Sequence, residues 1–216
     1  MLDRIEPELK TVSLDRDGVR LKHVEAGRDA PGKRPLVFVH GWIGDYPALG
    51  PQIAHFAKTR RVVGVALRGH GGSDAPMQEY TVAGFADDIA WQCRQLGLEK
   101  PVIVGHSFGG VITLDLAGRH PTLPSGIVMI DSIVFAPPVL RHAESVQQMV
   151  AGIEGPEYLA VARASAVDVC LDFNDPARKE AILDVICAAH PKTPQHVAYS
   201  TFVNSLDYDE IGRAHV

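Results

Sequence analysis

Five residues in the middle of the chain, Gly105-His106-Ser107-Phe108-Gly109, have the spacing of a Gly-x-Ser-x-Gly motif. They follow a short apolar run and precede a segment of helical length, and this context makes the pattern informative. A strand that turns sharply into a helix strains the residue at the turn, and only small residues fit two positions before and after it. The motif predicts that Ser107 is a nucleophile exposed at the carboxyl end of a strand. The alternative is a glycine-rich turn without chemistry.

The elements that would hold this turn alternate between strands and helices. Four short runs are rich in Val and Ile and nearly continuous, which is typical of parallel strands buried on both faces. These runs are Leu36–His40, Val62–Leu67, Val102–Gly105 and Ile127–Ile130. The helical segments between them are Pro47–Lys58, Thr81–Leu96 and Phe108–Arg119. The alternation predicts an α/β fold with a doubly wound, mostly parallel sheet, and Thr11–Val24 predicts an antiparallel hairpin before it.

The chain changes character after Ile130. Pro137-Pro138 interrupts it, no further Val- and Ile-rich strand follows, and the rest is helical in pattern. Pro156, Pro176 and Pro194 each suit the first position of a helix, where a missing N–H does no harm. We therefore expect an α/β core over residues 1–136, a helical cap over 137–208 and a tail over 209–216.

Three loops together resemble those of the α/β-hydrolase superfamily. His40-Gly41-Trp42 follows the first parallel strand, Arg68-Gly69-His70-Gly71-Gly72-Ser73 follows the second, and Gly105–Gly110 follows the third, in the family order. The resemblance covers about Thr11 to Pro137. It implies an α/β-hydrolase fold with a helical cap inserted after the sixth strand. Ala66 stands where the family often has Asp, a residue that we interpret as structural in the family.

The resemblance also implies an oxyanion hole and a triad. The backbone N–H groups of Trp42 and Phe108 would stabilise a tetrahedral oxyanion. A serine nucleophile further needs a histidine base that is oriented by a carboxylate. Asp131 ends the strand beside the nucleophile strand, 24 residues after Ser107, and is the candidate acid. The alternative is an aspartate that caps the strand end through Ser132, with the acid on a later strand.

The base is the missing part of this triad. In the family it follows the acid, in a loop after the last strand. None of the ten histidines has that place, and His215 has no apolar strand before it and only Val216 after it. We expect the last two strands, on the order of 50 residues with their helices, to be missing together with the base. The residues Ile211–Val216 back-translate to a common sequencing adapter, so we expect this tail to be non-native.

The predicted activity is hydrolysis of a small-molecule carboxylic ester through an acyl-enzyme. The cap would select the substrate, and its large apolar residues suit a small or medium apolar group, although each can equally be cap core. These residues are Met149, Tyr158, Leu159, Phe173 and Phe202. The alternatives are a C–C bond hydrolase, a cofactor-free haloperoxidase, a non-catalytic ligand-binding protein on the same fold, and an inactive fragment. Ser107 argues against dehalogenases and epoxide hydrolases, which use Asp as the nucleophile.

Composition restricts the partners. The net charge of −5 argues against nucleic acid or an anionic membrane as the main partner, and no apolar run approaches the ~20 residues of a membrane helix. No secretory signal and no CxxC pair is present, so Cys93, Cys170 and Cys187 are expected to be reduced in a cytoplasmic protein. No metal-ligand spacing or phosphate loop occurs, so neither a metal nor a cofactor is expected. The sequence predicts no particular oligomeric state.

Overall fold

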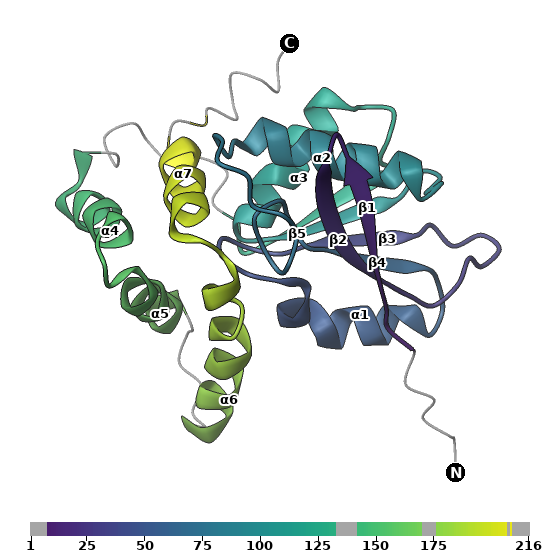
Figure 1. The fold of residues 1–216 in the computed structure, drawn as a ribbon. Helices are drawn as coiled ribbons and strands as arrows, with labels where there is room; N and C mark the ends of the chain where they lie inside the picture. Colours follow the sequence, from purple (N-terminus) through teal and green to yellow (C-terminus); the bar gives the residue numbers. More distant parts are fainter. Residues whose placement is uncertain (1–7, 133–141, 170–175, 207, 209–216) are drawn as a thin grey trace.

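The computed structural model describes residues 8–132, 142–169, 176–206 and 208. Its centre is a six-stranded sheet with the order β1-β2-β4-β3-β5-β6 (Figure 1). The strands are β1 (Lys10–Arg16), β2 (Val19–Ala26), β3 (Leu36–Val39), β4 (Val62–Val65), β5 (Val102–His106) and β6 (Gly126–Ile130). The last four are parallel to one another, whereas β1 and β2 are antiparallel. The predicted mostly parallel α/β sheet and its leading hairpin are confirmed.

Helices cover both faces of this sheet. Helix α1 (Gly50–Ala57), preceded by the 3-10 turn η1 (Tyr46–Leu49), covers one face, and α2 (Val82–Gln95) and α3 (Phe108–Arg119) cover the other. Strand β3 shows why, because its four residues are all buried and alternate between the two cores. Val39 packs toward α2 and α3, and Phe38 packs toward α1. The sheet is therefore doubly wound, as predicted.

Strand β6 differs from the expectation that it would be buried on both faces. Val128 is 45% exposed and Ile130 is 38% exposed, whereas Ile127 is partly buried in the core formed with α2 and α3. β6 is the last strand of the sheet, and within the described residues no helix covers its Val128 face. The Val- and Ile-rich pattern predicted this strand correctly, but it did not predict which face of the strand is covered by a helix.

Four helices and a short turn follow β6 in the described residues. They are α4 (Glu144–Glu154), α5 (Tyr158–Val169), α6 (Pro176–Cys187), η3 (His190–Lys192) and α7 (Gln195–Leu206). They lie beside the sheet rather than over either face (Figure 1). Ile153, Ala162 and Ala198 form their shared core together with Ile43. No helix in the described part of the chain has the length and apolar character required to cross a membrane.

Three prolines were expected to be the first residues of helices, and this expectation is correct for one helix. Helix α6 begins at Pro176, but α5 and α7 begin two residues after Pro156 and one residue after Pro194. The reason for α7 is that the carbonyl of Pro194 accepts the N–H groups of Val197 and Ala198, so Pro194 precedes the first helical residue. A proline keeps its carbonyl as an acceptor although it has no N–H to donate.

Two of the three cysteines lie in the described residues, and both are free thiols. Cys93 is buried in the core with α2 and α3, and this burial raises the pKa of its thiol to about 12, so it carries no thiolate near neutral pH. Cys187 is partly exposed. Cys170, Phe173, His215 and the expected tail over 209–216 lie outside the described residues.

Candidate functional site

Ser107 lies at the turn between β5 and α3. Its backbone has φ 53° and ψ −123°, a conformation that residues with a Cβ rarely adopt. A Cβ at Gly105 would overlap the carbonyl oxygen of Gly109, so the turn requires glycine at that position. The Ser107 side chain does not cap α3. The strained strand-to-helix turn predicted from the motif is present, and the serine hydroxyl is not used to hold the helix.

The loop after β3 comes up against this turn. A Cβ at Gly41 would lie 3.2 Å from the Ser107 Cβ, and β3 and β5 are neighbours in the sheet. The chain winds outward in opposite directions from these two strands, and such a switch point is where open α/β sheets bind ligands. Phe108 is the first residue of α3, where an N–H has no partner within the helix. The structure thus brings the Trp42 loop, Ser107 and Phe108 together.

Asp131 follows β6 directly, with φ 49° and an exposed side chain. The Ser107 N–H donates to the carbonyl of Ile130 at 2.9 Å, which places Asp131 next to the strand end that carries Ser107. The Ser132 hydroxyl donates to the same carbonyl at 3.2 Å. In the described part of the chain no histidine is hydrogen-bonded to Ser107 or Asp131. Burial lowers the pKa of His106, and the nearby Asp131 carboxylate partly opposes that shift.

Two buried histidines support the loops, and the sequence interpretation assigned neither a role. His40 Nε2 accepts the N–H of Leu67 at 3.1 Å, so its Nδ1 carries the proton and donates to the Gly41 carbonyl at 2.8 Å. His70 Nδ1 donates to the Arg68 carbonyl at 2.9 Å. Burial lowers the pKa of His40 to about 3 and that of His70 to about 4, so both rings are neutral at physiological pH. In the sequence, each histidine directly precedes a loop glycine, Gly41 or Gly71, and this position was the signal that could have indicated a supporting role.

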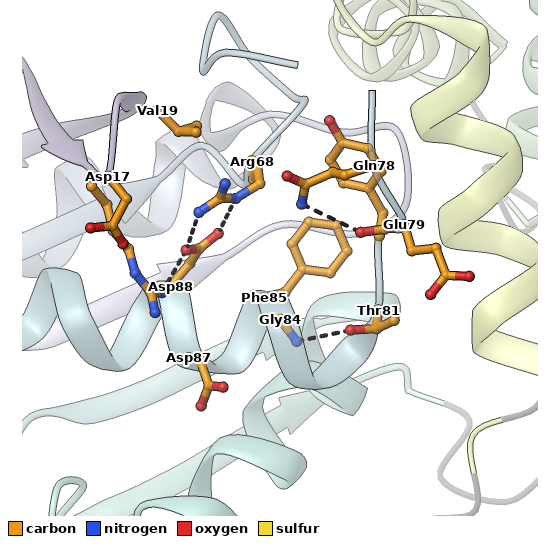
Figure 2. A pocket seen from close by; sticks show the side chains of 12 residues that line it. Asp17, Val19, Arg68, Gln78, Glu79, Thr81, Gly84, Phe85, Asp87 and Asp88 are labelled. Carbon is orange, nitrogen blue, oxygen red and sulfur yellow. Dashed lines mark hydrogen bonds and ion pairs between the residues drawn. The ribbon is translucent and has the colours of Figure 1, made fainter. Parts of the chain in front are cut away.

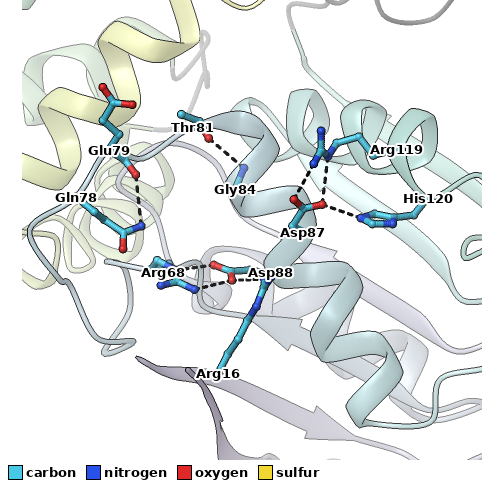
Figure 3. A network of polar contacts seen from close by, with 10 residues as sticks. All are labelled: Arg16, Arg68, Gln78, Glu79, Thr81, Gly84, Asp87, Asp88, Arg119 and His120. Atoms are coloured by element: carbon cyan, nitrogen blue, oxygen red, sulfur yellow. Dashed lines mark hydrogen bonds and ion pairs between the residues drawn. The ribbon is translucent and has the colours of Figure 1, made fainter. Parts of the chain in front are cut away.

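An ion-pair network holds the Arg68 loop from the other side (Figure 3). Arg68 donates to both carboxylate oxygens of Asp88 at 2.8 and 2.7 Å, and Arg16 donates to one of them at 2.7 Å. Asp88 is only 3% exposed, and this carboxylate raises the pKa of the Arg68 guanidinium. The network ties the loop after β4 to α2 and to β1. The sequence signal for this network was Asp88, a charged residue among the buried residues of α2.

A surface pocket of about 370 Å³ lies against the same network (Figure 2). Its lining includes Arg68, Gln78 and Phe85, but neither Ser107 nor Trp42. This pocket is therefore separate from the Ser107 turn, and its charged wall is the ion-pair network itself. No group of three His, Cys, Asp or Glu side chains suited to a metal ion occurs among the described residues.

The apolar residues expected to select the substrate fall into different environments. Met149 and Phe202 pack on the small core that includes Trp42, and the Phe202 and Trp42 ring centroids are 5.4 Å apart. The Tyr158 hydroxyl donates to backbone carbonyls near η3, which gives that ring a structural role. Leu159 is 42% exposed. Among the described candidates, Phe202 is therefore the one with a direct ring contact to Trp42. Met149 and Tyr158 pack against the same small core as Trp42.

Comparison with known proteins gives a family match and several relatives. Residues 34–159 match the family model described as alpha/beta hydrolase fold. Epoxide hydrolase 4 of Mus musculus is 32% identical over 145 residues, which are 63% of this chain and 40% of that protein. The bifunctional esterase/perhydrolase DCH of Acinetobacter calcoaceticus is 34% identical over 132 residues, which are 60% of this chain and 46% of that protein.

The solved structures show the same fold. The enol-lactonase from Burkholderia xenovorans LB400 superimposes with a TM-score of 0.81 at 19% identity, covering 94% of this chain and 76% of that one. A thermophilic esterase from Thermogutta terrifontis gives a TM-score of 0.75 at 22% identity, with 94% and 74% covered. The chain spans less than half the length of the two curated relatives above.

Proposed function

Because the chain belongs to the α/β hydrolase fold family, we propose that it carries the nucleophile part of a serine hydrolase that cleaves carboxylic esters. Ser107 Oγ attacks the ester carbonyl carbon, the alcohol leaves, and water then hydrolyses the acyl-enzyme. The backbone N–H groups of Trp42 and Phe108 stabilise the oxyanion of each tetrahedral intermediate. The expected substrate is a small molecule with an apolar acyl or alcohol group, and residues 137–208 act as the cap over it.

The backbone of Ser107 carries this proposal. Its φ of 53° holds a serine in a conformation that costs about 1–3 kcal/mol, and the adjacent glycine contacts leave no room for a relaxed turn. Strain of this kind persists where it serves a purpose, and here it exposes a hydroxyl at the switch point of the sheet. Gly41 lies against the serine side chain, so the Trp42 loop is in reach of an oxyanion formed there.

The relatives include epoxide hydrolases as well as esterases, and the nucleophile discriminates between them. Ser107 occupies the position at which the resemblance places an aspartate in epoxide hydrolases. Attack of Ser107 Oγ on an epoxide carbon would open the ring and form a β-hydroxy ether, which water does not hydrolyse readily. An acyl-serine ester, in contrast, is hydrolysed through the same oxyanion hole. Ser107 therefore favours esters over epoxides as the substrate class.

Asp131 is proposed as the acid, and its partner histidine is not assigned. The exposed Asp131 carboxylate at the end of β6 is free to accept an imidazole N–H. In the described part of the chain, the Asp131 carboxylate acts electrostatically on the pKa of His106, but it is not hydrogen-bonded to the His106 side chain. We propose that the complete triad includes a histidine other than those of the described residues.

The test combines labelling with turnover. We expect a fluorophosphonate probe, supplied together with imidazole in place of the unassigned triad base, to add one phosphonyl group to the chain, with loss of fluoride, and Ser107→Ala to abolish the addition in intact-mass spectra. Hydrolysis of p-nitrophenyl acetate and butyrate is measured in parallel, with Ser132→Ala as the matched serine control. Labelling that persists in Ser107→Ala would refute the nucleophile assignment. Turnover by the chain itself, lost in Ser107→Ala, would place a base among its own histidines.

A further inference from the structure

Helix α7 makes polar contacts with the Trp42 loop and with the segment that ends at Tyr80, before α2. The Trp42 indole N–H donates to the backbone carbonyl of Ala198 at 3.0 Å. The backbone N–H of Tyr80 donates to the Ser200 hydroxyl at 2.9 Å, and Asn204 Nδ2 donates to the Tyr80 carbonyl at 3.3 Å and to the Ser200 hydroxyl at 3.2 Å. One face of α7 is thus fixed to the Trp42 loop and to the loop that ends at Tyr80.

Close packing defines where α7 sits. Val197 is fully buried, and a Cβ at Gly69 would lie 2.6 Å from its Cγ1 atom, so the helix rests directly on the backbone of the loop after β4. Figure 2 shows the stretch from Gln78 to Thr81 running beside α7, which is drawn in pale yellow. The helix therefore has little freedom to slide relative to these loops while the contacts at Tyr80 remain.

The Trp42 loop, in contrast, contains a strained turn. The Gly41 carbonyl is held by His40 and by the N–H of Gly44 at 3.1 Å. Ile43 then has φ 47°, a strained value for a β-branched residue that persists only where surrounding contacts impose it. Ile43 is 2% exposed and packs on Ala198 and other residues of the cap helices. The turn on either side of the Trp42 amide is therefore held from the cap.

We propose that α7 sets the position of the Trp42 backbone N–H, so that the Trp42 side chain is a positioning residue for its own amide. The indole is anchored to the loop by its Cα and to α7 by its Nε1 atom, and Phe202 of the same helix packs on the ring. The inference rests on the proposed function, because it treats this amide as an oxyanion donor. Such a donor must lie about 2.7–3.1 Å from the oxyanion, so a small shift of α7 weakens it.

The consequence is a link between cap fit and chemistry. A substrate that lets α7 stay seated on Gly69 and Tyr80 meets a formed oxyanion hole. A substrate that pushes α7 outward pulls on the indole and displaces the amide. Discrimination between acyl groups would then be expressed in the rate of the chemical step as well as in binding.

The first test follows the indole proton directly. Trp91→Phe leaves Trp42 as the only tryptophan of the chain, so one indole N–H resonance reports on this contact. In that background we expect Ser200→Ala/Asn204→Ala to speed exchange of the indole proton on the order of tenfold, because α7 loses both side-chain contacts with Tyr80. Ser205→Ala is the matched control, since Ser205 lies on α7 but donates to the Phe202 carbonyl at 2.6 Å. It should leave the exchange rate unchanged.

Two outcomes would overturn the inference: unchanged indole exchange in a folded Ser200→Ala/Asn204→Ala protein, or equal acceleration by Ser205→Ala. If the double variant does not fold, Ser200→Ala alone is measured against the same control and judged by the same two outcomes. Trp42→Phe provides the functional measurement, and we expect a roughly tenfold lower maximal rate of Ser107 phosphonylation with little change in the half-saturating probe concentration. Absence of labelling in the parent chain, with imidazole supplied as the base, would reject the proposed function, while the indole exchange would still decide whether α7 holds Trp42.

Discussion

The two neutral histidines beneath the site loops make the stability of the chain sensitive to mild acid. The pKa of His40 is lowered by burial to about 3 and that of His70 to about 4, against 6.5 in an unfolded chain. The unfolded state therefore binds protons that the folded state does not. Stability is complete above pH 6.5 and is lost as the pH falls below that value, until the folded pKa is reached.

The size of the effect follows from the shift. Each pH unit below 6.5 costs about 1.4 kcal/mol per histidine, so at about pH 5 the loss is roughly 2 kcal/mol for His40 and roughly 2 kcal/mol for His70. A combined loss of about 4 kcal/mol is a large part of the 5–15 kcal/mol that typically holds a domain together. The titration of these two rings should therefore contribute strongly to the mild-acid behaviour of the core, beside that of His23, His106 and His190, whose pKa values burial also lowers.

His70→Asn separates this contribution from the others. The asparagine Nδ2 can replace His70 Nδ1 as donor to the Arg68 carbonyl, while His70 Nε2 is buried without a hydrogen bond and needs no replacement. The variant should lose some packing against Phe85 at every pH, because the two rings lie edge to face at 6.0 Å. Its loss of stability between about pH 7.5 and pH 5 should nevertheless be about 2 kcal/mol smaller than that of the parent chain.

Urea unfolding at the two pH values, followed by circular dichroism, measures this difference. His55→Asn, at an exposed position on α1, is the matched control and should show the same pH dependence as the parent. The reasoning would be wrong if His70→Asn lost as much stability on acidification as the parent did. It would also be wrong if His55→Asn reduced the loss to the same extent.

Three further predictions use the same unfolding assay or a sizing measurement. Asp88→Ala should destabilise by about 3 kcal/mol, because it leaves two partly buried arginines, Arg16 and Arg68, without their carboxylate. Asp87 pairs with Arg119 and His120 but is 32% exposed, so Asp87→Ala should cost only about 1 kcal/mol. Similar losses for the two variants would contradict a buried network. Ser107→Gly should raise the unfolding free energy by about 1 kcal/mol, because glycine adopts this backbone conformation without strain. The same variant should abolish phosphonylation, because it removes the hydroxyl. A loss of stability would show that the Ser107 backbone is not strained. Val128 and Ile130 are exposed on a strand at the edge of the described sheet, so we expect the chain to self-associate as its concentration rises. Val128→Lys should reduce this self-association, measured by light scattering. Unchanged association would show that the contact between chains lies elsewhere.

Much of the fold followed from local signals. The Asp17-Gly18 turn has positive φ at both residues, 56° and 79°, as a two-residue hairpin requires. Thr81 caps α2 by accepting the N–H of Gly84 at 3.1 Å, which is the role its place before the helix predicted. Short-range patterns of this kind are read within one element, so they do not depend on where the rest of the chain goes.

Features that depend on residues distant in the chain could not be predicted from the sequence. The exposure of Val128 depends on whether another element lies over β6, and the sequence of β6 carries no information on that. The site shows the same limit. The glycine spacing located the Ser107 turn, but the proton position on His40 is fixed by the N–H of Leu67, 27 residues away. The role of Asp131 stays a prediction for a related reason, because it depends on an imidazole partner.

The contacts that hold the candidate site share one property. His40 joins the loop after β3 to Leu67, Arg68 joins the loop after β4 to Asp88 on α2, and Trp42 joins the first of these loops to Ala198 on α7. Each contact connects segments that are distant in the chain, and each fixes a loop beside the candidate site. An oxyanion hole works only when its donors are in place before the reaction. The tertiary contacts therefore complete what the loop motifs specify, and a change at α7 or Asp88 should alter chemistry at Ser107 without contacting the substrate.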